Sequence, residues 1–168
     1  SDVYKRQAIS FDTDHNPTVG KAEKLEDDLV VITADNASPM TFTGTRTYIL
    51  GTENLIVIDP GPNSEAHLNS IMKYIGKRKV TDILLTDSHI DHSPLSRQLK
   101  TETGARIIGF GSADEARTSF MKKLSSSLDL GGEEGIDKDL ALDKKVVEKQ
   151  MLKSVSYTHL TLPTTSSV

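Results

Sequence analysis

The stretch TDSHIDH, residues 86–92, follows the apolar run ILL, residues 83–85, and guides the interpretation of the whole sequence. The apolar run predicts a buried strand, and a chain leaving the carboxyl end of a strand can aim alternate side chains at one point while it is still extended. We therefore expect Asp87 and His89 to converge on one metal ion, and Asp91 and His92 to point toward a second ion beside it. Imidazole nitrogen and carboxylate oxygen are both ordinary zinc ligands.

The composition narrows the possible chemistry. The chain has 168 residues, with 20 basic and 24 acidic side chains, a formal charge of −4 and a pI of about 5.7. Nucleic-acid binders normally carry a basic excess, so no DNA-binding patch is expected. Cysteine is absent, which excludes disulfides, thiolate zinc sites and a cysteine nucleophile, and leaves His, Asp and Glu as metal ligands. Without a long apolar segment or a signal peptide, the sequence predicts a soluble, cytoplasmic protein with no membrane partner.

Short apolar runs alternate with helical patterns along the chain. A helix is predicted from a cap at Asn63 or Ser64 to a stop at Gly76, since apolar residues recur there at helical spacing. A second helix is expected to open at Ser93-Pro94 and to end at Gly104, and a third to cover residues 114–124. Strands are predicted at residues 29–33, 47–50, 55–58, 83–85 and 106–110, after a polar surface lead-in at residues 8–27. This alternation of strands and helices predicts an α/β fold.

Both ends of the chain resemble translated adapter DNA. Residues 1–7, SDVYKRQ, can be written in codons whose reverse complement, read in a shifted frame, spells VSYTHL, residues 155–160. The DNA string is similar to the transposon-end adapter used to prepare sequencing libraries. We therefore expect residues 1–7 and 154–168 to be adapter-derived tails, and residues 8–153 to be a partial domain of a gene cut at both ends. His159 is accordingly not counted as a ligand, and neither are His15, in the lead-in, and His67, which is expected on the exposed face of the first helix.

The motif at residues 86–92 resembles that of the metallo-β-lactamase superfamily of metal-dependent hydrolases. The family's Thr-His-x-His-x-Asp-His hallmark follows a buried strand, and His89, Asp91 and His92 occupy the matching positions here. Upstream, GTRTYIL (44–50) and LIVIDPG (55–61) look like the family's paired opening strands and Asp-x-Gly turn. DHSP (91–94) and DPGP (59–62) are similar to the branch that contains the β-lactamase-like protein 2 endoribonucleases.

The resemblance implies the amino-terminal part of an αβ/βα sandwich with a one- or two-metal site at the strand ends. A metal in such a site lowers the pKa of bound water from about 15.7 to about 7, which provides hydroxide as the nucleophile. On this mapping His89 binds the first metal, while Asp91 and His92 bind the second. Asp91 is also the catalytic residue that orients the nucleophile or handles a proton, and Asp59 holds a ligand histidine through its other ring nitrogen. Zinc, two ions per complete site, is the expected cofactor.

The sequence departs from the family pattern in two ways. Asp87 stands where the family has its first histidine, and this carboxylate favours harder ions such as manganese or iron. A natural substitution and a one-base sequencing error both remain open for Asp87. The family also supplies further ligands from its second half, whereas residues 93–153 contain no histidine. The fragment is therefore expected to be inactive by itself.

Three functions remain open from the sequence. The first is a hydrolase that cleaves RNA phosphodiester bonds, and the second is a thioester hydrolase of the hydroxyacylglutathione type. The third is a non-catalytic domain in which Asp87 marks a decayed metal site. A further possibility is that the fragment folds poorly because half of its sandwich is missing. Substrate specificity in such a fold lies in loops and in the second half, so RNA and a small molecule both remain possible substrates.

Overall fold

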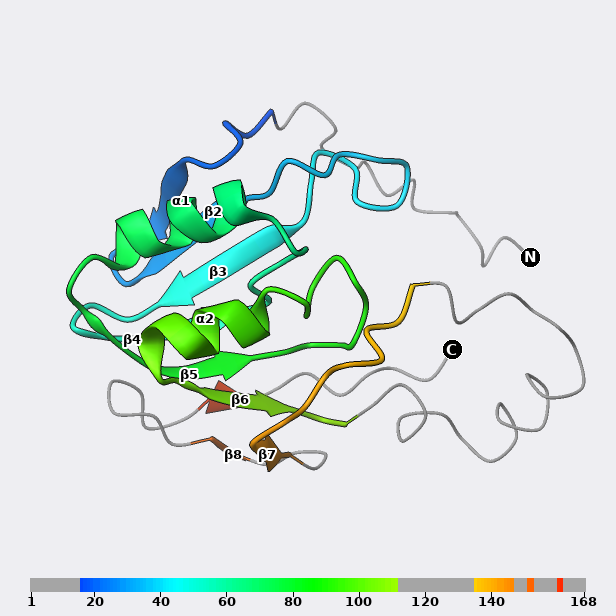
Figure 1. Ribbon diagram of the computed structural model, residues 1–168. Coiled ribbons are helices and arrows are strands. Elements are labelled where there is room, and N and C mark those ends of the chain that lie inside the picture. Colours follow the sequence, from blue (N-terminus) through cyan, green and yellow to red (C-terminus); the bar gives the residue numbers. More distant parts are fainter. Residues whose placement is uncertain (1–15, 112–134, 147–150, 153–159, 162–168) are drawn as a thin grey trace, which may run out of the picture.

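The structure, a computed structural model, describes residues 16–111 and 135–146, and the backbone of residues 151–152 and 160–161 (Figure 1). Its main feature is a mixed seven-stranded sheet in which the strands lie in the order of the sequence, from β1 to β7. The strands are β1 Ala22–Glu26, β2 Leu29–Thr33, β3 Arg46–Leu50, β4 Asn54–Ile58, β5 Lys79–Leu84, β6 Arg106–Gly109 and β7 Lys144–Lys145. The predicted α/β class is confirmed.

The first four strands form an antiparallel meander. β2 is the apolar run that the sequence predicted, and it is buried along almost its whole length. β1 was not predicted, because its sequence, AEKLE, lies in the expected polar lead-in. An edge strand is paired on one side only and its outer residues face water, so it forms without an apolar run. Here Ala22 pairs with Ile32 and packs against the core, while the last three residues of the strand, 24–26, are exposed.

The strands from β4 to β7 run parallel to one another. Helix α1, Glu65–Ile75, joins β4 to β5, and helix α2, Ser96–Thr103, joins β5 to β6. Both helices lie on the same face of the sheet (Figure 1), as expected when successive crossovers have the same hand and advance in the same direction. This parallel arrangement places the carboxyl ends of β4 and β5 at one edge of the sheet.

The caps of α1 agree with the sequence pattern, whereas the start of α2 does not. The Ser64 side chain accepts a hydrogen bond from the backbone N–H of His67, and Gly76, with φ of 59°, donates its N–H to the carbonyl of Met72. α2 was predicted to open at Ser93-Pro94 but begins at Ser96, with no side-chain cap. The hydroxyl of Ser93 cannot act as a cap because it is directed at the carbonyl of His89 and the carboxylate of Asp137.

Apolar side chains cover both faces of the sheet. The larger cluster lies between the sheet and the helices and includes Ile32, Ile49, Val57, Ile71 and Leu99, all buried. A smaller cluster on the other face consists of Ile56, Leu84, Ile108 and Val146. Burial on both faces explains why the central strands are continuous apolar runs rather than alternating patterns.

Some predictions fall outside the described residues. These include the helix at residues 114–124, the tail at residues 1–7 and most of the tail at residues 154–168. Near the end of the chain, β8, Met151–Leu152, pairs with β9, Leu160–Thr161, in a separate two-stranded sheet. In the part of the chain that the structure describes, no helix has the length and apolar character needed to cross a membrane.

Candidate functional site

The candidate site begins where two neighbouring parallel strands end. Asp59 directly follows β4, and its N–H donates to the carbonyl of Leu84 at the end of β5 (2.9 Å). Its carboxylate is buried and accepts two hydrogen bonds from Thr86, one from the backbone N–H (2.8 Å) and one from the hydroxyl (2.6 Å). Asp59 also has a positive φ of 48°, which is uncommon outside glycine. These contacts fix the carboxylate at the strand ends.

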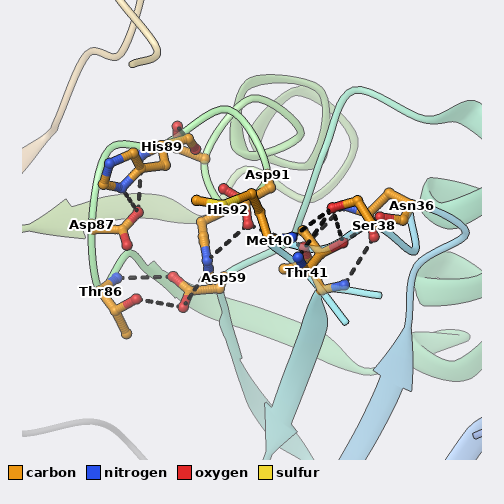
Figure 2. A network of polar contacts seen from close by, with 12 residues as sticks. Asn36, Ser38, Met40, Thr41, Asp59, Thr86, Asp87, His89, Asp91 and His92 are labelled. Carbon is orange, nitrogen blue, oxygen red and sulfur yellow. Dashed lines mark hydrogen bonds and ion pairs between the residues drawn. The ribbon is translucent and has the colours of Figure 1, made fainter. Parts of the chain in front are cut away.

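His92 lies between two carboxylates (Figure 2). Its Nδ1 atom is 3.2 Å from Oδ2 of Asp59, and its Nε2 atom is 3.2 Å from Oδ2 of Asp91. The Nδ1 contact has the length of an ion pair, but the groups are not aligned for a regular hydrogen bond. The carboxylate of Asp59, followed by smaller contributions from Asp87 and Asp91, raises the pKa of His92 to about 9, against an opposing effect of burial.

Asp87 and His89 form a second pair, nearer the surface. Oδ1 of Asp87 is 3.2 Å from Nδ1 of His89 and accepts a hydrogen bond from its backbone N–H (2.9 Å). This side-chain-to-backbone contact two residues along is the usual turn made by aspartate. The side chain of His89 is 57% exposed and that of Asp87 is 39% exposed, so both are accessible to a ligand.

The two pairs fit a metal site only in part. Two ligand atoms on one tetrahedral zinc ion lie about 3.3 Å apart, given metal–ligand bonds of about 2.0 to 2.1 Å. The separation of 3.2 Å within each pair matches this value. Within residues 16–111 and 135–146, however, no three His, Asp or Glu side chains are gathered around one point. The structure thus brings Asp87 to His89 and Asp91 to His92, as two separate carboxylate–imidazole pairs.

Asp91 is held from the antiparallel half of the sheet, a contact that the sequence did not reveal. The hydroxyl of Thr45 donates to Oδ2 of Asp91 (3.3 Å). Asn36 fixes Thr45 in turn, since its side-chain oxygen accepts the N–H of Thr45 (2.8 Å) and its amide nitrogen donates to the hydroxyl (2.9 Å). Asn36 lies in the connection between β2 and β3. Thr45 and Asp91 are 46 positions apart, so no local pattern links them.

Asp137 holds the loop of residues 86–92 through a second set of contacts that the sequence did not predict. The carboxylate of Asp137 is buried and accepts hydrogen bonds from Ser93 (2.9 Å) and from Arg97 (2.7 and 2.9 Å). The backbone N–H of Asp137 donates to the carbonyl of Ser88, and that of Ile90 donates to the carbonyl of Gly135. The segment before β7 therefore fixes the position of the loop of residues 86–92 through backbone contacts with Ser88 and Ile90.

An open pocket of about 340 Å³ adjoins Asp91 and His92. Its walls are residues 40–46 and Tyr48, from the β2–β3 connection and β3, together with Asp59, Asp91 and His92. Its volume lies at the lower end of the range of small-molecule sites. A ligand in this pocket would touch the two residues to which the sequence assigned the second metal.

His67 does not lie where the sequence predicted it. It was expected on the exposed face of α1, yet it is only 3% exposed and its Nε2 is 2.8 Å from the hydroxyl of Thr47. Burial lowers its pKa to about 4. The ring packs against Gly61, where a β-carbon would stand 3.1 Å from a ring atom. The signal was available, because His67 precedes Ile71 and Ile75 at intervals of four residues and belongs to the same buried stripe.

Comparison with known proteins agrees with this architecture. Residues 40–168 match the family model of the metallo-beta-lactamase superfamily, and the chain belongs to this superfamily. A beta-lactamase-like protein 2 homolog from Drosophila melanogaster is 35% identical over 101 residues, covering 54% of this chain and 34% of the relative. The lactamase-like protein aptB from Emericella nidulans is 30% identical over 80 residues, covering 46% of this chain and 26% of the relative.

Solved structures of the same fold extend the comparison. A beta-lactamase domain protein from Burkholderia ambifaria superposes with a TM-score of 0.59 at 16% identity, covering 83% of this chain and 46% of its own. The FEZ-1 metallo-beta-lactamase from Legionella gormanii superposes with a TM-score of 0.57 at 16% identity, covering 83% of this chain and 51% of the FEZ-1 chain. The chain thus spans about half of the solved structures and about a third or less of the curated relatives. This partial coverage fits the predicted amino-terminal part of the fold.

Proposed function

We propose that the whole protein is a metal-dependent hydrolase of the metallo-β-lactamase fold that cleaves phosphodiester bonds in RNA. The observation that carries this proposal is the arrangement of His92 between Asp59 and Asp91 at the carboxyl ends of β4 and β5. Membership of the superfamily supports the hydrolase class, and the likeness to a beta-lactamase-like protein 2 homolog is compatible with the RNA substrate.

Each residue of this arrangement has a distinct part in the proposal. His92 would hold a divalent ion through Nε2, and Asp59, fixed by Thr86, would orient the ring through Nδ1. Asp91 lies close enough to His92 to share that ion, and it is the residue that would accept a proton from attacking water. A divalent ion bound here would supply the Lewis acid that makes hydroxide available near neutral pH.

His89 and Asp87 would hold the second ion of a complete site. Their pair supplies one nitrogen and one oxygen, so this position would accept manganese or iron more readily than an all-histidine position. Zinc remains the ion proposed for His92 and Asp91. The remaining ligands would come from the part of the relatives that this chain does not cover. We place this activity in the cytoplasm.

A non-catalytic domain is the second candidate, and one observation favours it. Each histidine of the motif is already paired with a carboxylate, and no three potential ligands are gathered within the described ranges. In that case the pairs are ion pairs that stabilise the loop, and Asp87 marks a lost ligand.

Metal binding separates these two candidates. Equilibrium dialysis of the 168-residue chain against zinc is expected to show bound zinc, with the affinity reduced at least tenfold by Asp91→Asn. Asp27→Asn, an exposed aspartate beside β1, is the matched control and should bind as the parent chain does. Binding that is unchanged in Asp91→Asn, or absent altogether, would leave the non-catalytic domain as the better account.

Identifying the substrate requires an assay on the product of the complete gene. We expect this protein to cleave a single-stranded RNA and to leave an S-acylglutathione intact. The reverse result would identify it as a thioester hydrolase.

A further inference from the structure

Arg46 differs from the other arginines that the structure describes. Arg97 pairs with Asp137, Arg106 pairs with Asp82, and Arg78 donates to backbone carbonyls and lies over the ring of Tyr74. Arg46 makes no ion pair or hydrogen bond through its side chain with any other residue in the described ranges, although it is half-buried and forms part of the pocket wall. A guanidinium group in a pocket wall that has no partner among the described residues is available to a ligand.

The alternation of β3 explains why Arg46 lies in the pocket. Thr47 and Ile49 are buried, and Thr47 contacts His67 of α1, so these residues face the helices. Arg46 and Tyr48 fall on the opposite side of the strand, and both line the pocket.

The carboxylates of the pocket are already engaged. Asp59 accepts from Thr86 and faces His92, while Asp91 faces His92 and accepts from Thr45. Neither carboxylate lies within ion-pair distance of Arg46 among the described contacts. The donors of the guanidinium are therefore not taken up by these two carboxylates, and its planar fork suits a pair of phosphate oxygens.

An aromatic ring lies at the rim of the same pocket. Phe42 is 58% exposed and has a φ of 55°, a conformation that is strained for a phenylalanine. The turn that holds it there is well braced, since the N–H of Phe42 donates to the carbonyl of Ser38 (2.7 Å) and the Ser38 hydroxyl accepts from the N–H of Thr41 (3.1 Å). Strain that the surrounding structure maintains is typical of a binding site.

We infer that this pocket binds a segment of single-stranded RNA, with Arg46 paired to a phosphate and Phe42 stacked on a base. Exposed aromatic rings beside cationic groups are the usual means of binding unpaired strands. A glutathione thioester has carboxylates for Arg46 but no ring for Phe42, so the pair of residues favours RNA. The inference rests on the proposed function for its choice of substrate, and it adds the residues that recognise it.

Binding to a fluorescein-labelled hexaribonucleotide, measured by anisotropy on the 168-residue chain in EDTA, tests the inference without any metal or cleavage. Arg46→Gln is expected to weaken binding about tenfold, because a charge-assisted contact to phosphate is lost. The slope of log affinity against log salt concentration should fall by about 0.7, the value for one phosphate contact on a single strand. Arg46→Lys should restore the slope but only part of the affinity.

Matched variants separate recognition from general effects. Lys77→Gln removes the same charge from an exposed position just after α1 and should leave binding unchanged. Phe42→Leu should weaken binding about tenfold, whereas Phe42→Tyr retains the ring and should bind as the parent does.

Undetectable binding of the parent chain, or equal binding by Arg46→Gln and the parent, would overturn the inference. Arg46-dependent binding by a protein that cleaves no RNA would support the inference while refuting the proposed function.

Discussion

Lowering the pH should destabilise the protein through His67, and the structure gives both the cause and the size of the effect. The hydroxyl of Thr47 lies 2.8 Å from the carbonyl of Asp59 and 2.8 Å from Nε2 of His67. A carbonyl oxygen can only accept a hydrogen bond, so the Thr47 hydroxyl donates to the carbonyl of Asp59 and accepts a hydrogen bond from the N–H at Nε2 of His67. Nδ1 is then the unprotonated nitrogen, and it is buried without a partner among the described residues.

Protonation of Nδ1 would place a charge in this buried position, and burial accordingly lowers the pKa of His67 from 6.5 to about 4. The unfolded chain therefore binds the proton more readily than the folded chain does between these two values. The contribution of neutral His67 to the free energy of unfolding is complete above pH 6.5 and is lost as the pH falls toward 4. Between pH 7.5 and pH 5 the loss amounts to about 2 kcal/mol in the free energy of unfolding.

A pH scan of the parent chain alone would hide this loss. The pKa of His92 is raised to about 9, so its contribution is complete below pH 6.5 and is lost as the pH rises through 9. The same change from pH 7.5 to pH 5 would thus raise the free energy of unfolding by roughly 1 kcal/mol through His92. The measurement therefore compares the parent with His67→Gln, which cannot titrate but retains a donor for Thr47.

Urea unfolding of both proteins at pH 7.5 and pH 5, in EDTA, gives the required difference. The parent should lose about 2 kcal/mol relative to His67→Gln over this interval. If the two proteins respond to pH within about 0.5 kcal/mol of each other, His67 is protonated in the fold and the reasoning from its buried Nδ1 is wrong.

Three further predictions concern the loop of residues 86–92. Asp137→Asn should lower the free energy of unfolding by about 2 kcal/mol in urea, because the ion pair with Arg97 is lost; the loss stays below that of a fully buried pair since Arg97 is partly exposed. The control Asp27→Asn should not shift the urea midpoint. Thr45→Val should cost about 1 to 2 kcal/mol because the donor to Asp91 is lost, and retained stability would show that this bond is not formed. Asp87→His should raise the affinity for zinc over manganese at least tenfold in competition dialysis, since imidazole is the softer ligand; an unchanged ratio would mean that position 87 does not contact metal.

Local rules predicted most of the elements that position the site. The β-branched run at residues 29–33 became β2, and Ser64 and Gly76 cap α1 as expected. These predictions succeeded because each depends on neighbouring residues only. β1 was missed because its pairing with β2, and not its own composition, makes it a strand. The start of α2 was wrong because tertiary contacts of Ser93 with His89 and Asp137 replaced the local cap.

The candidate site shows the same division between local and distant contacts. The pairing of Asp87 with His89 and the proximity of Asp91 to His92 follow from one short loop. The supporting residues Thr45 and Asp137 lie 46 and 44 positions from their partners, distances that only the order of strands in the sheet can bridge. A single sequence without related sequences carries no signal for such pairs.

These distant contacts have a consequence for how the loop is positioned. Asp59 anchors it from the end of β4, Thr45 from the antiparallel half of the sheet, and Asp137 from the segment before β7. Three supports from separate parts of the sheet constrain both the position and the orientation of the loop, whereas one support would leave it free to turn. The two carboxylate–imidazole pairs are therefore held in place by the fold itself, and under the proposed function a metal ion would meet side chains that are already oriented. This differs from small zinc domains, in which the ion must organise the ligands and the chain together.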